Sequence, residues 1–164
     1  MKNYLQFCTV ILALFLGGRG FAQEDPGRAA LGELEVTVYF ATNGDVSVVG
    51  PGAGVVPDDI QKRLRCETKL KFSHYRGMGK DTQPIFRSYE NWAQPLKPSD
   101  EILVRFETRT QPEAHSFALD LELWLARKKV LKTDALLLPD RPLFILGPKW
   151  RGGQLIVAVE LASK

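Results

Sequence analysis

The most regular pattern in this chain is the stretch Ser116-Phe-Ala-Leu-Asp-Leu-Glu-Leu-Trp-Leu-Ala126. Its phenylalanine and leucines occupy every second position from 117 to 125, and Asp, Glu and Trp fall between them. Side chains alternate between the two faces of a β-strand, whereas a helix repeats every 3.6 residues. The stretch therefore predicts a strand with one apolar face packed against a second layer, although leucine by itself favours helices.

Shorter segments of the same kind lie on both sides of this stretch, and turn residues separate them. We expect further strands at 33–41, 46–49, 69–76, 83–92, 101–109, 130–138, 142–146 and 154–161. The segment Gly77-Met78-Gly79 is expected to end the strand at 69–76. Many short strands with regular turns predict a mainly all-β fold, either an antiparallel β-sandwich or a small open barrel, immunoglobulin-like in general architecture.

One short helix is expected near residues 57–68. Pro57 suits a first helical position, and the acidic side chains of Asp58 and Asp59 favour the positive end of the helix dipole. Ile60 and Leu64 form a narrow apolar stripe that we expect to face a core.

The first 22 residues have the layout of a secretory signal peptide. Lys2 precedes the apolar run from Leu5 to Leu16, and small residues stand before Gln23. A run of this length is shorter than the roughly 20 residues of a membrane span. We therefore expect a signal peptide at 1–22, a flexible lead-in at 23–32 and a single β-rich domain at 33–162, secreted or periplasmic and without a membrane span.

The net charge and the cysteine content limit the classes of function that fit this chain. The formal net charge of +3 falls by two, to +1, when Lys2 and Arg19 leave with the signal peptide, which does not favour nucleic-acid binding. Cys66 is then the one remaining cysteine. It is either buried, which we favour because free cysteine behaves as a small hydrophobe, or paired in a disulfide between two chains.

A second motif lies near the end of the chain, where Gly147-Pro148-Lys149-Trp150-Arg151-Gly152-Gly153 precedes a last apolar strand. With the helix upstream and the aromatic residues Phe72 and Tyr75 that follow it, the chain resembles an uncharacterised family of small secreted bacterial proteins. Those proteins carry a C-terminal Gly-Pro-x-aromatic-x-Gly-Gly hairpin. The resemblance implies an exported β-rich domain and no particular activity.

Two constellations could support catalysis. Asp120 and Glu122 share one face of a strand about 6.5–7 Å apart, a separation suited to an inverting glycosidase, but acidic residues are also ordinary on a solvated strand face. Cys66 and His74 could form a thiol nucleophile with its base, although no third residue orients them. We expect neither pair to be catalytic.

Cofactor and metal motifs do not occur. The glycine-rich loop at 50–54 lacks the Gly-Lys-Ser/Thr of a phosphate-binding loop, and a plain connector is expected there. The two histidines and the single mature cysteine do not have zinc-ligand spacing. We therefore expect no cofactor and no metal.

Basic and aromatic residues are the remaining candidates for a binding surface. Positive side chains gather in three places, namely Lys62 to Lys71, Arg127 to Lys132, and the pair that flanks Trp150. Such groups are commonly solvated edges, but they also attract anionic partners. Aromatic side chains at a surface can anchor an interface or stack on sugars. The predicted binding residues are Trp150, Lys149, Arg151 and Trp124.

From these observations we expect an exported, non-enzymatic binding or structural protein of the bacterial cell envelope that acts through protein contacts. One alternative is a carbohydrate- or peptidoglycan-binding module that uses the same aromatic residues. A further alternative is a small glycan hydrolase built on Asp120 and Glu122.

Overall fold

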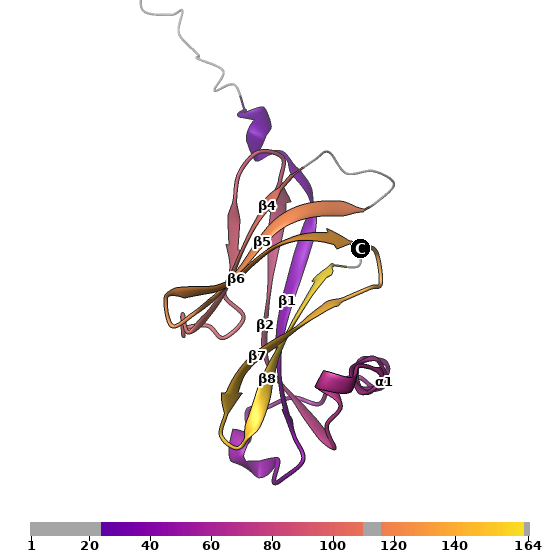
Figure 1. Cartoon of the computed structure of the whole chain (residues 1–164). Coiled ribbons are helices and arrows are strands. Elements are labelled where there is room, and N and C mark those ends of the chain that lie inside the picture. The colour runs from indigo at the N-terminus through magenta and orange to yellow at the C-terminus, as the bar shows by residue number, and fades with distance from the viewer. Residues whose placement is uncertain (1–23, 110–115, 163–164) are drawn as a thin grey trace, which may run out of the picture.

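Two antiparallel four-stranded sheets face one another in the computed structural model, which describes residues 24–109 and 116–162 (Figure 1). The first sheet has the strand order β2-β1-β8-β7, with β1 (Ala30–Thr42), β2 (His74–Phe86), β7 (Leu143–Trp150) and β8 (Gly153–Leu161). The second has the order β3-β4-β5-β6, with β3 (Asn91–Ala93), β4 (Ile102–Thr108), β5 (Phe117–Leu125) and β6 (Lys128–Leu137). The signal peptide predicted at 1–22 lies outside the described residues.

The alternating stretch forms β5, as predicted. Its apolar side chains point between the sheets and are buried from Phe117 to Leu123, with Leu125 half-buried at the end, while the residues between them lie on the outer face. They pack against Leu34, Val36, Val38 and Phe40 of β1 in one continuous core. This packing confirms the all-β sandwich.

The strand β1 is buried on both of its faces. Its outward side chains Tyr39 and Ala41 lie in a second apolar cluster with Ile60 and Leu64 of the helix α1 (Asp58–Cys66). The predicted helix and its apolar stripe are therefore confirmed, although α1 is shorter than the expected range of 57–68. A 3-10 turn, η3 (Thr68–Leu70), follows it, and Figure 1 shows α1 beside the end of the first sheet that carries the β7–β8 turn.

Three of the expected strands are wrong. The strand expected at 83–92 is split between the end of β2 and the separate strand β3 of the other sheet. Residues 47–49 form the 3-10 turn η2 (Ser47–Val49) rather than a return strand. The strand expected at 69–76 begins only at His74, and it continues through Gly77-Met78-Gly79 instead of ending there. The reason is a change of register with β1 between Val38 and Tyr39, where the glycines accommodate a bulge.

The remaining boundaries differ by a few residues. The strand β1 begins at Ala30, inside the predicted lead-in, and a further 3-10 turn, η1 (Pro26–Arg28), precedes it. Pro84 is tolerated within β2 because that strand forms the edge of its sheet. Among residues 24–109 and 116–162, no helix is both long and apolar enough to cross a membrane.

Candidate functional site

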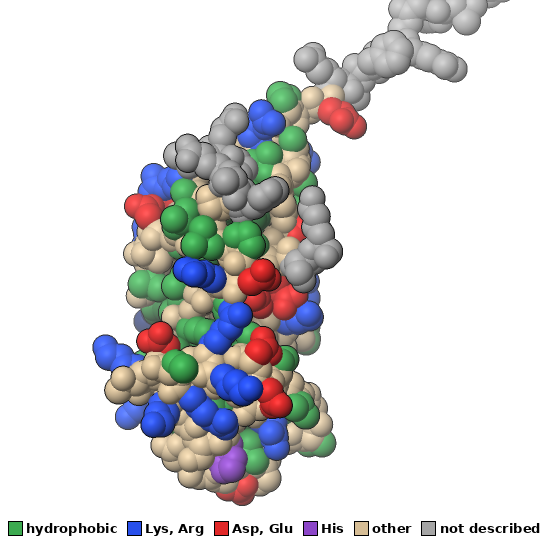
Figure 2. All heavy atoms as spheres, turned by 90° about the vertical axis from the view of Figure 1, so that its right-hand side faces the viewer, with side chains coloured by type: hydrophobic (Ala, Val, Ile, Leu, Met, Phe, Trp, Pro, Cys, Tyr) green, Lys and Arg blue, Asp and Glu red, His purple; other side chains and the backbone are tan. Residues whose placement is uncertain are grey.

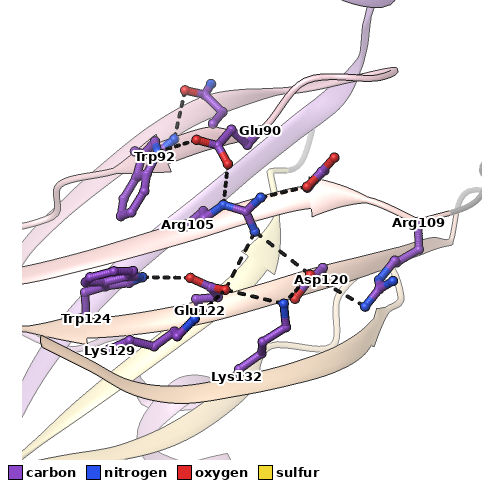
Figure 3. A network of polar contacts seen from close by, with 11 residues as sticks. Glu90, Trp92, Arg105, Arg109, Asp120, Glu122, Trp124, Lys129 and Lys132 are labelled. Atoms are coloured by element: carbon purple, nitrogen blue, oxygen red, sulfur yellow. Dashed lines mark hydrogen bonds and ion pairs between the residues drawn. The ribbon is translucent and has the colours of Figure 1, made fainter.

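The outer face of the second sheet carries a network of charged side chains (Figure 3). Its centre is formed by Asp120 and Glu122, which alternate with the core leucines of β5. The strand register places Arg105 of β4 on one side of Glu122 and Lys132 of β6 on the other. Three adjacent strands therefore contribute opposite charges to one row.

The two carboxylates are buried although they face away from the sandwich core. Asp120 is 7% exposed and Glu122 is 5% exposed. The Lys132 Nζ atom lies 2.9 Å from Oδ2 of Asp120 and 3.5 Å from Oε1 of Glu122. Arg105 and Arg109 approach the same carboxylates from β4 and from the residue just after it, at 3.5 to 3.9 Å. Long cationic side chains thus cover the acidic pair.

Two tryptophans close one end of this network. Trp124 Nε1 donates a hydrogen bond to Oε2 of Glu122 at 3.0 Å, and Trp92 Nε1 donates to Oε1 of Glu90 at 3.3 Å. Their ring centroids are 5.7 Å apart, so β3 covers Trp124 and leaves it half-buried. Glu90 also pairs with Arg105, which joins β3 to the central carboxylates.

Both central carboxyl groups have a lowered pKa. The hydrogen bond from Lys132 lowers the pKa of Asp120, and its ion pairs add to the effect. Burial raises the pKa of Glu122, but hydrogen bonds from Trp124 and Lys129 outweigh it and leave the pKa lowered. An inverting glycosidase needs one carboxyl that stays protonated near neutral pH. The lowered pKa of both carboxyls and their ion pairs with Lys132 therefore favour an electrostatic link between strands over acid–base catalysis.

A second candidate lies at the β7–β8 hairpin. Arg151 and Gly152 form its two-residue turn, with φ of 44° and 77°. Positive φ at both positions is the geometry of the type I′ turn, whose twist matches that of paired strands. The turn presents Lys149 and Arg151 to solvent, and Trp150 is half-buried between them.

Trp150 is held between the core and an arginine. Its ring packs edge-on against Phe40 with centroids 5.6 Å apart. The guanidinium of Arg151 lies over the indole, 4.5 Å from the ring centroid, and its Nη1 donates to the backbone carbonyl of Val48 at 2.8 Å. The arginine is therefore fixed by stacking and by a hydrogen bond, and Trp150 is part of the packed end of the sandwich.

The hairpin borders an open depression of about 500 Å³. Phe72, which follows η3, forms one wall, and the remaining lining is hairpin residues 149–154. Within residues 24–109 and 116–162, no aspartate or glutamate lines it. Lys and Arg side chains also gather over the lower part of the face that carries α1 (Figure 2).

The glycine motif of this hairpin has a steric basis. A Cβ on Gly147 would stand 3.0 Å from the carbonyl oxygen of Leu155, and one on Gly153 would stand 2.5 Å from the Phe40 ring. Pro148 lies where the β7–β8 register shifts, on an edge strand that does not need its missing N–H. The motif therefore builds a tight, aromatic-packed turn.

The predicted binding residues separate into two groups. Lys149, Trp150 and Arg151 lie together at the hairpin, whereas Trp124 belongs to the charged network on the other sheet. Sequence reasoning missed Phe72 as a site residue, because its position beside the hairpin depends on long-range packing. It also missed Arg105, although the outward alternation of β4 was a signal for it.

The expected burial of Cys66 is wrong. Cys66 is exposed at the last position of α1, because it lies two residues beyond the buried Leu64 and so on the opposite helix face. The disulfide between chains stays a prediction. His74 begins β2 and is also exposed. Among the described residues, no group of three or more His, Cys, Asp or Glu side chains could hold a metal ion.

Comparisons of the chain with protein-family models, with curated proteins and with solved structures found no match.

Proposed function

We propose that this chain is a non-enzymatic binding domain whose hairpin depression holds an acidic segment of a partner protein. The observation that carries the proposal is the lining of the depression, in which Lys149 and Arg151 stand beside aromatic walls and none of the described acidic residues takes part. Opposite charge at a concave surface steers a partner and fixes its orientation.

The hairpin residues have separate roles in this proposal. Trp150 is a support, because its ring packs on Phe40 and holds the guanidinium of Arg151. Arg151 is already ordered by Trp150 and by the carbonyl of Val48, so less side-chain entropy is lost when it binds a carboxylate. Lys149 is exposed and forms no ion pair within the part of the chain that the structure describes, so it is available to a second carboxylate.

The proposed setting is the bacterial cell envelope. The layout of residues 1–22 favours export, and a secreted or periplasmic domain meets envelope proteins first. Cys66, which is exposed, could join two chains by a disulfide in that oxidising compartment.

A carbohydrate-binding module is the second candidate, and one observation favours it. Trp92 is 36% exposed and lies 5.7 Å from Trp124, which gives the outer face of the second sheet an aromatic surface. The two rings are tilted by 58°, so a sugar could stack on Trp92 but not on both rings at once. The hydrolase is disfavoured because Asp120 and Glu122 both have lowered pKa values.

The test is a calorimetric titration of the full chain with poly-L-glutamate and, separately, with soluble peptidoglycan fragments. We expect poly-L-glutamate to bind, with an affinity that falls as salt rises. Lys149→Glu and Arg151→Glu should each weaken that binding by at least about tenfold, which corresponds to about 1.4 kcal/mol.

Arg87→Glu is the matched control, because it makes the same change of net charge. Arg87 follows the end of β2 that pairs with Ala30, whereas the hairpin joins the sheet beside Ala41, at the other end of β1. If Arg87→Glu weakened the binding of poly-L-glutamate equally, the effect would depend only on net charge, and the proposal would be contradicted. Binding of peptidoglycan fragments that is lost in Trp92→Ala would favour the carbohydrate module instead.

A further inference from the structure

The edge strand β6 is the most open backbone of the sandwich. Within the described residues it pairs only with β5 and forms the last strand of its sheet. Its ten residues contain neither proline nor glycine. Edge strands with unpaired N–H and C=O groups are templates for pairing with another chain.

The other sheet edges carry features that oppose such pairing. The strand β2 contains Pro84 and a glycine bulge, and β7 contains Pro148 at a register shift. The strand β3 has only three residues. These features are known protections against edge-to-edge association. The strand β6 also has a register shift with β5 beside Val130, but it has ten residues and contains neither proline nor glycine, so from Leu131 to Leu137 it is the edge most available for pairing.

The outer face of β6 carries an ordered set of side chains. Val130 is 53% exposed and lies at the register shift with β5, and Leu136 is 65% exposed. Between them stand Lys132, which also pairs with Asp120, and Asp134, which also pairs with Arg109. The row therefore reads apolar, positive, negative, apolar. If a second copy of the strand pairs antiparallel with this one, its row runs in the opposite direction. Each charged side chain then lies opposite one of opposite sign, and each apolar side chain lies opposite another apolar one.

This complementarity selects one register. When two β6 strands pair antiparallel about Thr133, Val130 faces Leu136 of the second copy and Lys132 faces its Asp134. Opposite charges and apolar pairs across neighbouring strands each stabilise a sheet. Both contacts occur twice, because an interface with two-fold symmetry repeats every pair.

Neighbouring registers are opposed by like charges. Moving the centre of pairing from Thr133 to Lys132 places the two Lys132 side chains opposite each other, and moving it to Asp134 does the same for the aspartates. Like charges directly opposite destabilise a strand pair. A lysine on an edge strand opposes unspecific pairing with other strands. Here Lys132 is compatible only with the register in which it lies opposite Asp134 of the second copy.

A hollow beside Leu136 adds to the fit. It has a volume of about 420 Å³ and is lined by Arg109, Ala118, Leu119, Asp134, Ala135 and Leu136. In the register about Thr133, Val130 of the second copy arrives beside Leu136, at the rim of this hollow. The hollow therefore offers apolar and charged lining residues to the Val130 and Lys132 side chains of the second copy.

We propose that two copies of this chain associate through antiparallel pairing of their β6 strands about Thr133, which joins two four-stranded sheets into one. This interaction surface lies on the sheet opposite the hairpin depression, so it does not depend on the binding function proposed above.

Disulfide trapping tests the register directly. The starting chain has both native cysteines, Cys8 and Cys66, replaced by serine, and pairing is then probed under mild oxidation. Thr133→Cys should give a covalent dimer, because residues opposite each other in an antiparallel pair have Cα atoms about 4.5–5.5 Å apart, within disulfide range. Val130→Cys combined with Leu136→Cys should also trap a dimer, and both of these sites are exposed.

The single variants Val130→Cys and Leu136→Cys are the matched controls for the double variant. Residue 130 of one copy would lie six positions from residue 130 of the other, roughly 20 Å along the strand. Val130→Cys alone and Leu136→Cys alone should therefore not be trapped. Dimers from the single variants at a similar yield, or no dimer from either Thr133→Cys or the double variant, would overturn the proposal.

A second test introduces a charge into the proposed β6–β6 interface and measures dimerisation without any added cysteine. Leu136→Lys should weaken dimerisation about tenfold in sedimentation equilibrium, because it replaces an apolar contact by a charge. Leu146→Lys on β7, where Leu146 is 45% exposed, should leave the association unchanged. An equal effect of the two variants, or a monomer at all concentrations, would contradict the proposal.

Discussion

Gly153 lies so close to Phe40 that a Cβ on the glycine would stand 2.5 Å from two carbons of the phenyl ring. The same Cβ would stand 2.5 Å from the carbonyl oxygen of Ala41. Phe40 is fully buried and supports the ring of Trp150, so it has little freedom to move away. The glycine at this position therefore sets the packing of the whole hairpin end.

Gly153→Ala should destabilise the fold by about 3 kcal/mol, because the added methyl group overpacks Phe40 and the backbone of Ala41. Gly152→Ala is the matched control. Gly152 has φ of 77° with open space around it, so alanine there should cost only about 1 kcal/mol of backbone strain. Urea denaturation of both variants measures the difference, and a smaller effect at Gly153 than at Gly152 would contradict this packing.

The β5–β6 turn stores strain in two residues other than glycine. Ala126 and Arg127 have φ of 46° and 65°, a region that L-residues adopt at a cost. Arg127→Gly should therefore be more stable than Arg127→Ala by about 1 kcal/mol. Both variants lose the exposed ion pair with Asp100, so the comparison isolates the backbone term. Equal thermal midpoints would show that the turn is not strained.

The charged network predicts a specific loss of stability in acid. The folded pKa of Asp120 lies below its ordinary value of 3.8, because Lys132 hydrogen-bonds to the carboxylate. Its stabilisation is therefore complete well above pH 3.8 and is lost as the pH falls through the lowered folded pKa.

Asp120→Asn should accordingly lower stability at neutral pH and have less effect in strong acid, where the native carboxylate is protonated. Asp134→Asn serves as control, since the Asp134 side chain is 77% exposed and should change little at either pH. Urea midpoints measured across the acid range test this difference. A loss from Asp120→Asn that stays constant with pH would contradict the electrostatic role.

Glu160 predicts the opposite pH dependence. It stands directly across from Glu35 in the β1–β8 pair, and burial followed by the charge of Glu35 raises its pKa above 4.5. Arg63 and Lys80 oppose this rise and Asp59 adds to it. A raised folded pKa means that ionised Glu160 destabilises the fold as the pH rises through that value.

Glu160→Gln should therefore stabilise the protein by about 0.5 kcal/mol at neutral pH, the size of a like-charge strand pair. The gain should vanish below the ordinary pKa of 4.5, where both folded and unfolded carboxyls are protonated. Glu33→Gln removes the same charge from an exposed position and should not reproduce the gain. A stabilisation that persists in acid would show that charge is not its cause.

The elements that sequence predicted best depend on local periodicity. The alternation from Phe117 to Leu125 decides which face of β5 is buried, and the spacing of Ile60 and Leu64 does the same for α1. Both patterns are complete within one element. The sequence predicts a strand end at Gly77-Met78-Gly79, where the structure has a bulge, because glycine can interrupt either a strand or only its register.

The candidate sites depend on residues that no local pattern connects. Asp120 is buried on an outward face because Lys132 and Arg105 reach it from two neighbouring strands, a relationship that requires the register. Trp150 is supported by Phe40, more than a hundred residues earlier in the chain. Sequence could therefore name Trp150 and its basic neighbours as candidates but could not show that the indole is a support.

An NMR titration with an acetylated hexaglutamate peptide shows whether the hairpin depression binds an acidic segment. We expect the amide signals of Phe72, Lys149, Arg151 and Gln154 to shift together and saturate, while those of Arg87 and the strand β6 stay unchanged. Shifts confined to other basic surfaces, or no shift at the hairpin at any peptide concentration, would contradict the proposed function.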